Sequence, residues 1–133
     1  PRALVSVGIL LITHRPLAGD LLRIAAEILG QPPVGVACCE VINDTPLDEI
    51  LTRCQHLAAT IDQGEGVLAL TDLYGATPDN VARALADSRA RACVVSGLNL
   101  PMLLRTLNYA ALDLDSLVEK ALSGGRDGVR RCE

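Results

Sequence analysis

The chain has 133 residues, half of them apolar, and a formal net charge of −4 at pH 7, which fits one globular domain with a sizeable core. Phe and Trp are absent and two tyrosines are the only aromatic residues, so the core is aliphatic, and both this composition and the acidic balance argue against a nucleic-acid surface. The longest apolar run, in residues 4–12, is too short to span a bilayer.

The cysteines indicate a reducing compartment. There are five, an odd number, and none forms a Cys-x-x-Cys pair, which favours free thiols in the cytoplasm. The start of the chain also lacks the pattern of a secretory signal. Cys54 and His56 lie two positions apart on an expected helix, so they do not share a face, and this argues against zinc. We expect no metal and no cofactor.

Residues 4–29 predict a strand, a tight turn and a helix. Residues 4–12, LVSVGILLI, form an aliphatic run typical of a strand that is buried on both faces of a parallel sheet. Residues 17–29 carry apolar side chains at helical spacing, and Gly30 follows them as a stop. Pro16 suits the first helical position.

His14 lies between this strand and this helix. Open α/β sheets bind their ligands at the carboxyl ends of central strands. Free N–H groups at the start of the adjacent helix would favour an anion held on or near His14. The alternative is a histidine that only caps a turn.

Three more strands and four more helices are expected. Strands are predicted over residues 34–41, 67–71 and 92–96. Helices are predicted to begin after a turn at Thr45-Pro46, with Thr45 as cap, at Thr77-Pro78, with Thr77 as cap, and after residues 97–101. A last helix over residues 115–122 is expected to break at Gly124-Gly125. The polar tail holds one short candidate for an edge strand, around Val129.

This alternation predicts an α/β fold, a three-layer sandwich whose mainly parallel sheet has the order 2-1-3-4, with the tail as a candidate antiparallel edge strand. No linker or repeat divides the chain, so one domain over residues 1–133 is expected. The order places strands 1 and 3 side by side. His14 and Asp72, which end those strands, would then meet at the topological switch point.

The expected pair has a definite chemistry. A carboxylate that accepts a hydrogen bond from one ring nitrogen fixes the tautomer of His14 and leaves the other nitrogen as a nucleophile or base. Helix starts at Pro16 and Pro78 would stabilise a phosphoryl group, and Thr77 would donate a further hydrogen bond unless its hydroxyl serves as a cap. No Walker loop, dinucleotide fingerprint or serine elbow is present. The pattern therefore favours a covalent carrier over a self-contained enzyme.

Three segments carry a resemblance to a known family. They are Thr13-His14, residues 72–80 (DLYGATPDN) and residues 97–103 (GLNLPML), in this order and spacing. Together they resemble the enzyme IIA domain of the mannose family of the bacterial phosphoenolpyruvate-dependent sugar phosphotransferase system. The resemblance covers the chain from about Val5 to Arg131, and residues 72–80 are its most specific part.

The resemblance implies a phosphotransferase component that acts as a phosphohistidine carrier. His14 would accept a phosphoryl group from the phosphocarrier HPr and pass it to a histidine of an enzyme IIB, with Asp72 as the orienting residue. Thr77 would line the phosphate site, and Ala76 and Arg15, beside Thr77 and His14 in the sequence, are this chain's own further candidates for binding the phosphate. The resemblance also implies a homodimer in which the C-terminal strand crosses to the partner's sheet, and a link to the membrane only through a transporter complex. Transport, a regulatory phosphorelay and support of a dihydroxyacetone kinase all stay open, as does the sugar.

Two residues depart from the family pattern. Arg15 stands where the family usually has Gly, and its guanidinium would hold phosphate, restrict a partner's approach, or simply be a solvated turn residue. Ala76 replaces the second Gly of the usual pair, so a positive φ there would be strained.

One alternative belongs to another functional class. The chain would then be a small-molecule-binding or interaction module on a flavodoxin-like sheet, with His14 unphosphorylated. It predicts ligand binding that survives His14→Ala. A nucleotide-dependent kinase is disfavoured because the sequence holds no phosphate loop.

Overall fold

The computed structural model describes residues 5–133, so Leu4, which the sequence analysis assigned to the first strand, lies outside the described residues. The described part of the chain contains four strands and five helices. The strands are β1 (Gly8–His14), β2 (Val36–Val41), β3 (Val67–Thr71) and β4 (Ala92–Ser96). The helices are α1 (Leu17–Leu29), α2 (Leu47–Ile61), α3 (Thr77–Asp87), α4 (Leu100–Asn108) and α5 (Leu114–Asp127).

The four strands form one parallel sheet with the order β2-β1-β3-β4. This confirms the predicted α/β class and strand order. β1 is central and six of its seven residues are buried, which explains why its sequence is an aliphatic run rather than an alternation of polar and apolar residues.

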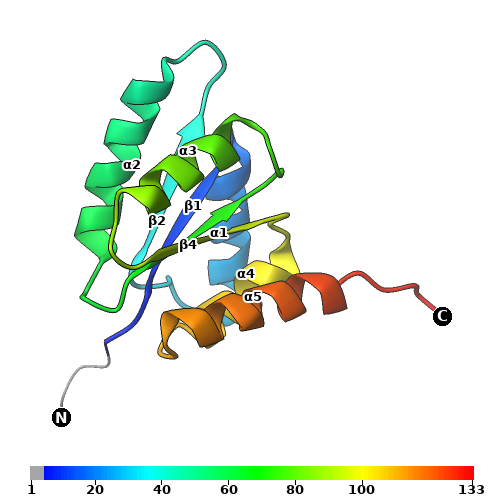
Figure 1. The fold of residues 1–133 in the computed structure, drawn as a ribbon. Coiled ribbons are helices and arrows are strands. Elements are labelled where there is room, and N and C mark those ends of the chain that lie inside the picture. The colour runs from blue at the N-terminus through cyan, green and yellow to red at the C-terminus, as the bar shows by residue number, and fades with distance from the viewer. Residues whose placement is uncertain (1–4) are drawn as a thin grey trace.

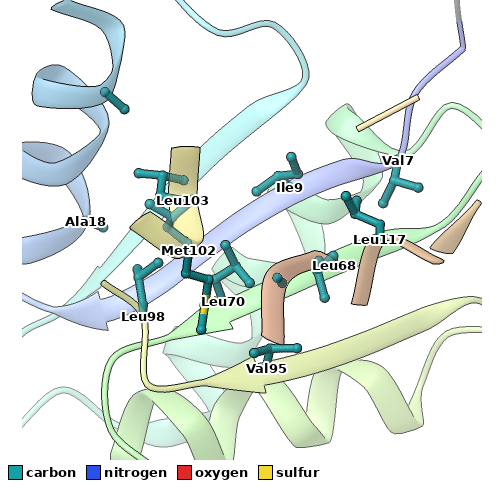
Figure 2. Close-up of a cluster of buried hydrophobic side chains, with 13 residues drawn as sticks. Val7, Ile9, Ala18, Leu68, Leu70, Val95, Leu98, Met102, Leu103 and Leu117 are labelled. Carbon is teal, nitrogen blue, oxygen red and sulfur yellow. The ribbon is translucent and has the colours of Figure 1, made fainter. Parts of the chain in front are cut away.

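Helices cover both faces of the sheet (Figure 1). Ile9 and Leu11 of β1 face one core, which receives side chains from α1, α4 and α5 (Figure 2). Leu10 and Ile12 face the other core, which receives side chains from α2 and α3. The predicted three-layer sandwich is therefore confirmed, and its two cores result from the period-two alternation of side chains along each strand.

The first strand lies further along the chain than predicted. β1 begins at Gly8 because the backbone before it bonds elsewhere: Val7 N–H donates to Ala110 O over 2.9 Å. At the other end, pairing with β2 continues until His14 lies opposite Val41. His14 is therefore the last residue of a strand and not part of the turn.

The helix starts are also displaced from the predicted positions. Pro16 and Pro46 immediately precede α1 and α2 and do not occupy their first positions. Thr45 makes no capping bond, and Thr77 is the first residue of α3 rather than its cap. In each case the residue at the cap position makes no side-chain capping bond.

The prediction that Gly124-Gly125 end the last helix was wrong. α5 runs on to Asp127, and residues 129–133 form no strand, so the candidate antiparallel edge strand around Val129 is not seen in the described chain. The physical reason is close packing, since a Cβ on Gly124 would lie 2.7 Å from the Cβ of Arg105 on α4. The glycines let two helices approach, and this tertiary requirement outweighs their low helix propensity.

No helix in residues 5–133 combines the length and the apolar character that crossing a membrane requires.

We expect Gly124→Ala to destabilise the fold. Alanine gains up to about 1 kcal/mol of helix propensity, but the clash with Arg105 costs about 1–3 kcal/mol, so a net loss of about 1 kcal/mol should appear in urea unfolding. Gly125→Ala is the matched control, because the one close contact of its Cβ, at 2.7 Å, would be with the terminal methyl of the flexible Met102 side chain rather than with a Cβ. A Gly124→Ala protein at least as stable as the Gly125→Ala protein would contradict this account.

Candidate functional site

His14 and Asp72 meet at the carboxyl edge of the sheet. His14 ends β1, Asp72 directly follows β3, and these two strands are neighbours. Asp72 Oδ2 lies 2.8 Å from His14 Nδ1 and also accepts the backbone N–H of His14 over 3.0 Å. The predicted proximity of the two residues is confirmed.

This contact selects one tautomer of His14. A carboxylate in its ionised form only accepts hydrogen bonds, so in a neutral His14 ring this contact favours the proton on Nδ1 and leaves the lone pair on Nε2. The His14 side chain is 44% exposed, whereas that of Asp72 is 12% exposed. The histidine is thus available to an incoming group, and the carboxylate is shielded beneath it.

The Asp72 carboxylate is bound to His14 alone. Its second oxygen, Oδ1, is buried and has no hydrogen-bond partner among residues 5–133. Leaving a buried acceptor unpaired is unfavourable. Asp72 is therefore positioned by its backbone and by His14, with no other side chain holding it.

The start of α1 is less open to an anion than the sequence analysis expected. Ala18 N–H donates to Thr13 Oγ1 over 2.9 Å, and Gly19 N–H donates to Glu40 Oε2 over 3.0 Å. The chain thus satisfies these first-turn donors itself. Sequence reasoning missed both bonds. The bond to Glu40 exists only once β1 and β2 are paired, whereas the bond to Thr13 joins residues five positions apart and is local.

The start of α3 is arranged differently. Ala76 is the cap residue with φ −79° and ψ 172°, so its side chain causes no strain, and Gly75 alone takes the positive φ of 82°. No side chain caps α3. The Thr77 hydroxyl is therefore not consumed by a capping bond, which was the alternative that the sequence left open.

Arg15 lies beside His14 in an open groove of about 550 Å³. The groove is lined by residues from the β1–α1 and β2–α2 connections: His14, Arg15, Pro16, Val41, Ile42 and Asn43. Arg15 is exposed, its N–H donates to Val41 O over 3.2 Å, and no ion pair in the described part of the chain involves its guanidinium. A free cation therefore stands next to the histidine.

Asp79 is the feature of this edge that sequence reasoning missed. It is completely buried and accepts hydrogen bonds from Thr71, Gly75, Arg83 and Ser96. A signal was present, since an acidic residue in the first turn after a glycine-containing loop is a common device for holding helix starts. Within residues 5–133 no three His, Cys, Asp or Glu side chains gather as metal ligands would.

Asp79 is ionised in the folded protein. Burial by itself raises the pKa of this carboxyl, but hydrogen bonds from Gly75, Thr71 and Ser96, together with the nearby Arg83 charge, hold the pKa below its ordinary value. Removing any one of these donors would leave part of the cost of burying the charge uncompensated. The carboxylate therefore holds its donors in place.

Comparison with known proteins identifies the family. The sequence profile described as PTS system fructose IIA component, EIIA-man, matches residues 8–122. The chain belongs to the EIIA-man family of phosphotransferase-system components. This confirms the resemblance drawn from the sequence motifs.

Individual relatives agree with this family. The chain is 30% identical to the mannose-specific EIIAB component of Escherichia coli K12 over 128 residues, which is 95% of the chain but 39% of that protein. It is 28% identical to the sorbose-specific EIIA component of Lacticaseibacillus casei, covering 83% of the chain and 79% of that protein. The mannose/sorbose-specific IIA subunit from Enterococcus faecalis has the same fold, with a TM-score of 0.87, 22% identity and 96% of each chain covered.

The lowered pKa of Asp79 predicts a pH-dependent stability. An unfolded aspartate titrates near about 3.9, so the contribution of Asp79 is complete above that pH and is lost as the pH falls through its lower folded pKa. We expect the free energy of unfolding, measured in urea, to fall as the pH is lowered below about 4. Asp79→Asn should lose less over this interval, since its amide gains no proton. An identical loss in both proteins would contradict the prediction.

Proposed function

We propose that this chain, as one EIIA domain over residues 1–133, carries a phosphoryl group on His14 between two protein partners. HPr, phosphorylated on histidine, would be the donor, and a histidine of an enzyme IIB would be the acceptor, in sugar uptake or in a regulatory phosphorelay. The observation that carries the proposal is the 2.8 Å contact between His14 Nδ1 and Asp72 Oδ2, with the histidine half exposed above it.

The contact suits a reversible transfer. The lone pair of Nε2 attacks the phosphorus, the bond from phosphorus to the donor nitrogen breaks, and the new nitrogen–phosphorus bond forms on His14. The proton on Nδ1 stays in place, and the Asp72 carboxylate stabilises the positive charge that develops on the ring. Transfer to the acceptor histidine runs the same steps in reverse.

Three further residues would hold the phosphoryl oxygens. Thr77 and Ala76 lie where the backbone N–H groups of α3 begin, and the Thr77 hydroxyl makes no capping bond. Arg15 would bring its unpaired guanidinium from the groove side. Because the first donors of α1 are already bonded, α3 is the better-suited helix start for the anion.

The assembly and location follow from the same proposal. Homodimer formation is supported by β4, which pairs with β3 on one side and has no strand on the other among the described residues. The five cysteines are free thiols, which suits the cytoplasm. The chain would meet the membrane only through the transporter complex.

One observation favours a second candidate function. The groove of about 550 Å³ beside His14 is large enough for a small molecule. A binding or interaction module would use this groove without any covalent step. It predicts that ligand binding persists in the His14→Ala protein, whereas the carrier requires the imidazole.

Incubation with phosphoenolpyruvate, enzyme I and HPr should add one phosphoryl group to the wild-type chain, seen as an increase in intact mass that acid removes. His14→Ala should abolish this addition because the nucleophile is gone. His56→Ala is the matched control, since His56 is the chain's other histidine and lies on the exposed side of α2. Labelling that survives in His14→Ala, or is lost in His56→Ala, would refute the assignment of His14.

Asp72→Asn should slow the transfer by at least about tenfold, since an amide can turn its N–H₂ toward the imidazole and favour the wrong tautomer. The fold should stay intact because the two side chains have the same shape. Rapid-quench measurement of the phosphorylation rate, with circular dichroism as the check on folding, tests both statements. A wild-type rate in the Asp72→Asn protein would exclude an orienting role for Asp72.

A further inference from the structure

The Asp79 carboxylate binds both the strand ends and the loop between β3 and α3. Its Oδ1 accepts the hydroxyls of Thr71, at 2.8 Å, and Ser96, at 3.0 Å. Thr71 ends β3 and Ser96 ends β4, so this one oxygen joins the carboxyl ends of two neighbouring strands. Its Oδ2 accepts the backbone N–H of Gly75 over 3.0 Å.

These bonds hold the chain on both sides of Asp72. Thr71 directly precedes Asp72, and Gly75 follows it by three residues. A single buried carboxylate therefore fixes the two ends of the short segment that carries Asp72. The loop is tightened further by Ala76 N–H, which donates to Leu73 O over 3.2 Å.

The position of the Asp72 carboxylate depends on this backbone. Both of its hydrogen bonds go to His14, and its buried Oδ1 has no partner in residues 5–133. No second side chain keeps the carboxylate aimed at the imidazole. Any movement of the segment between Thr71 and Gly75 would thus be transmitted directly to His14.

Arg83, whose side chain is partly exposed, contacts both Asp79 and the loop. Its Nη2 lies 2.8 Å from Asp79 Oδ2, and its guanidinium carbon lies 4.5 Å from the centre of the Tyr74 ring. The arginine thus binds the anchoring carboxylate and, through a cation–π contact, the middle of the loop. Its side chain is 46% exposed, so it is open to substitution.

We propose that Asp79 is a positioning residue for phosphoryl transfer, which it supports by fixing the loop that aims Asp72 at His14. Arg83 assists by binding both Asp79 and Tyr74. This inference rests on the proposed carrier function of His14. Asp79 touches neither His14 nor the reacting atoms, and it acts on them through the backbone of Asp72.

The decisive variant is Asp79→Asn. The amide keeps the shape of the side chain, and its oxygen still accepts from Gly75, while its N–H₂ can donate to the Thr71 and Ser96 hydroxyl oxygens. What it loses is the negative charge, which strengthens the bonds to Thr71, Ser96 and Gly75 and also binds Arg83, so the segment that carries Asp72 is held less firmly. Two properties are measured: the tautomer ratio of the His14 ring by ¹⁵N NMR of the free protein, and the rate of phosphorylation by phospho-HPr.

The proposal predicts a change in both. The Nδ1–H tautomer, dominant in the wild-type protein, should give way to a mixture, and the transfer rate should fall on the order of tenfold, since small misplacements at reacting groups are costly. Arg83→Met, at an exposed site, should shift both properties in the same direction by a smaller amount and guards against a folding failure of Asp79→Asn. The effects of the two changes should be less than additive in the double variant, because both break the same ion pair.

Asp62→Asn is the matched control. Asp62 also pairs with an arginine, Arg89, at 2.7 Å, and also accepts N–H groups from a glycine loop, Gly64 and Gly66. It precedes β3, at the opposite end of the sheet from His14. This variant should lose stability without changing the His14 tautomer or the transfer rate.

The two proposals fail in different ways. If the wild-type chain takes no phosphoryl group from competent HPr, the carrier function is refuted, and the tautomer ratio still decides whether Asp79 positions His14. If the wild-type chain is phosphorylated but Asp79→Asn and Arg83→Met leave the tautomer and the rate unchanged, the positioning role is refuted. Equal effects of Asp62→Asn and Asp79→Asn would refute it as well, because they would show general loosening.

Discussion

The parallel pairing of β1 with β3 is the constraint on which the site depends. It sets Ile12 opposite Thr71, and β1 continues for two residues beyond this pair, to His14, while β3 ends there. Asp72, the first residue after β3, can therefore reach the end of β1 without a long side chain or a mobile loop. A histidine and a carboxylate 58 positions apart in the sequence are brought to 2.8 Å by backbone register alone. A one-residue slip of this register would turn the neighbouring side chains to opposite faces.

The first turns of α1 and α3, the helices that follow β1 and β3, differ in how their polar groups are bonded. At α1, Thr13 and Glu40 take up the donors of the first turn, so the helix is closed by its own chain. At α3, the buried Asp79 carboxylate binds the preceding loop and leaves the Thr77 hydroxyl outside any cap. The two helix starts therefore differ in which of their polar groups the chain itself has already bonded.

The sequence was sufficient for those features that arise from local pattern. The bounds of α1, β3 and β4 were predicted as observed, and the strand order followed from alternation and handedness. His14 and Asp72 could be paired because both end strands that this order makes neighbours. Features that depend on tertiary contact were not predictable. The sequence around Gly124 predicts the end of a helix, and only the close contact with Arg105 shows why glycine is needed there. Asp79 resembles an ordinary acidic residue of a first helical turn, and only the folded chain brings the Thr71 and Ser96 hydroxyls to its carboxylate.

Ala76 and Arg15, the two departures from the family pattern, differ in their structural consequences. Ala76 is harmless because the loop needs only one left-handed residue, and Gly75 supplies it, with φ 82°. Arg15 is a real change of chemistry, since it places an exposed cation beside the nucleophile, where glycine would leave open space. In the proposed transfer, a guanidinium there would attract a phosphoryl dianion but would also narrow the approach of a second protein. Arg15 would then act on rate and partner choice from the groove side of His14, while Asp72 would orient the ring from beneath.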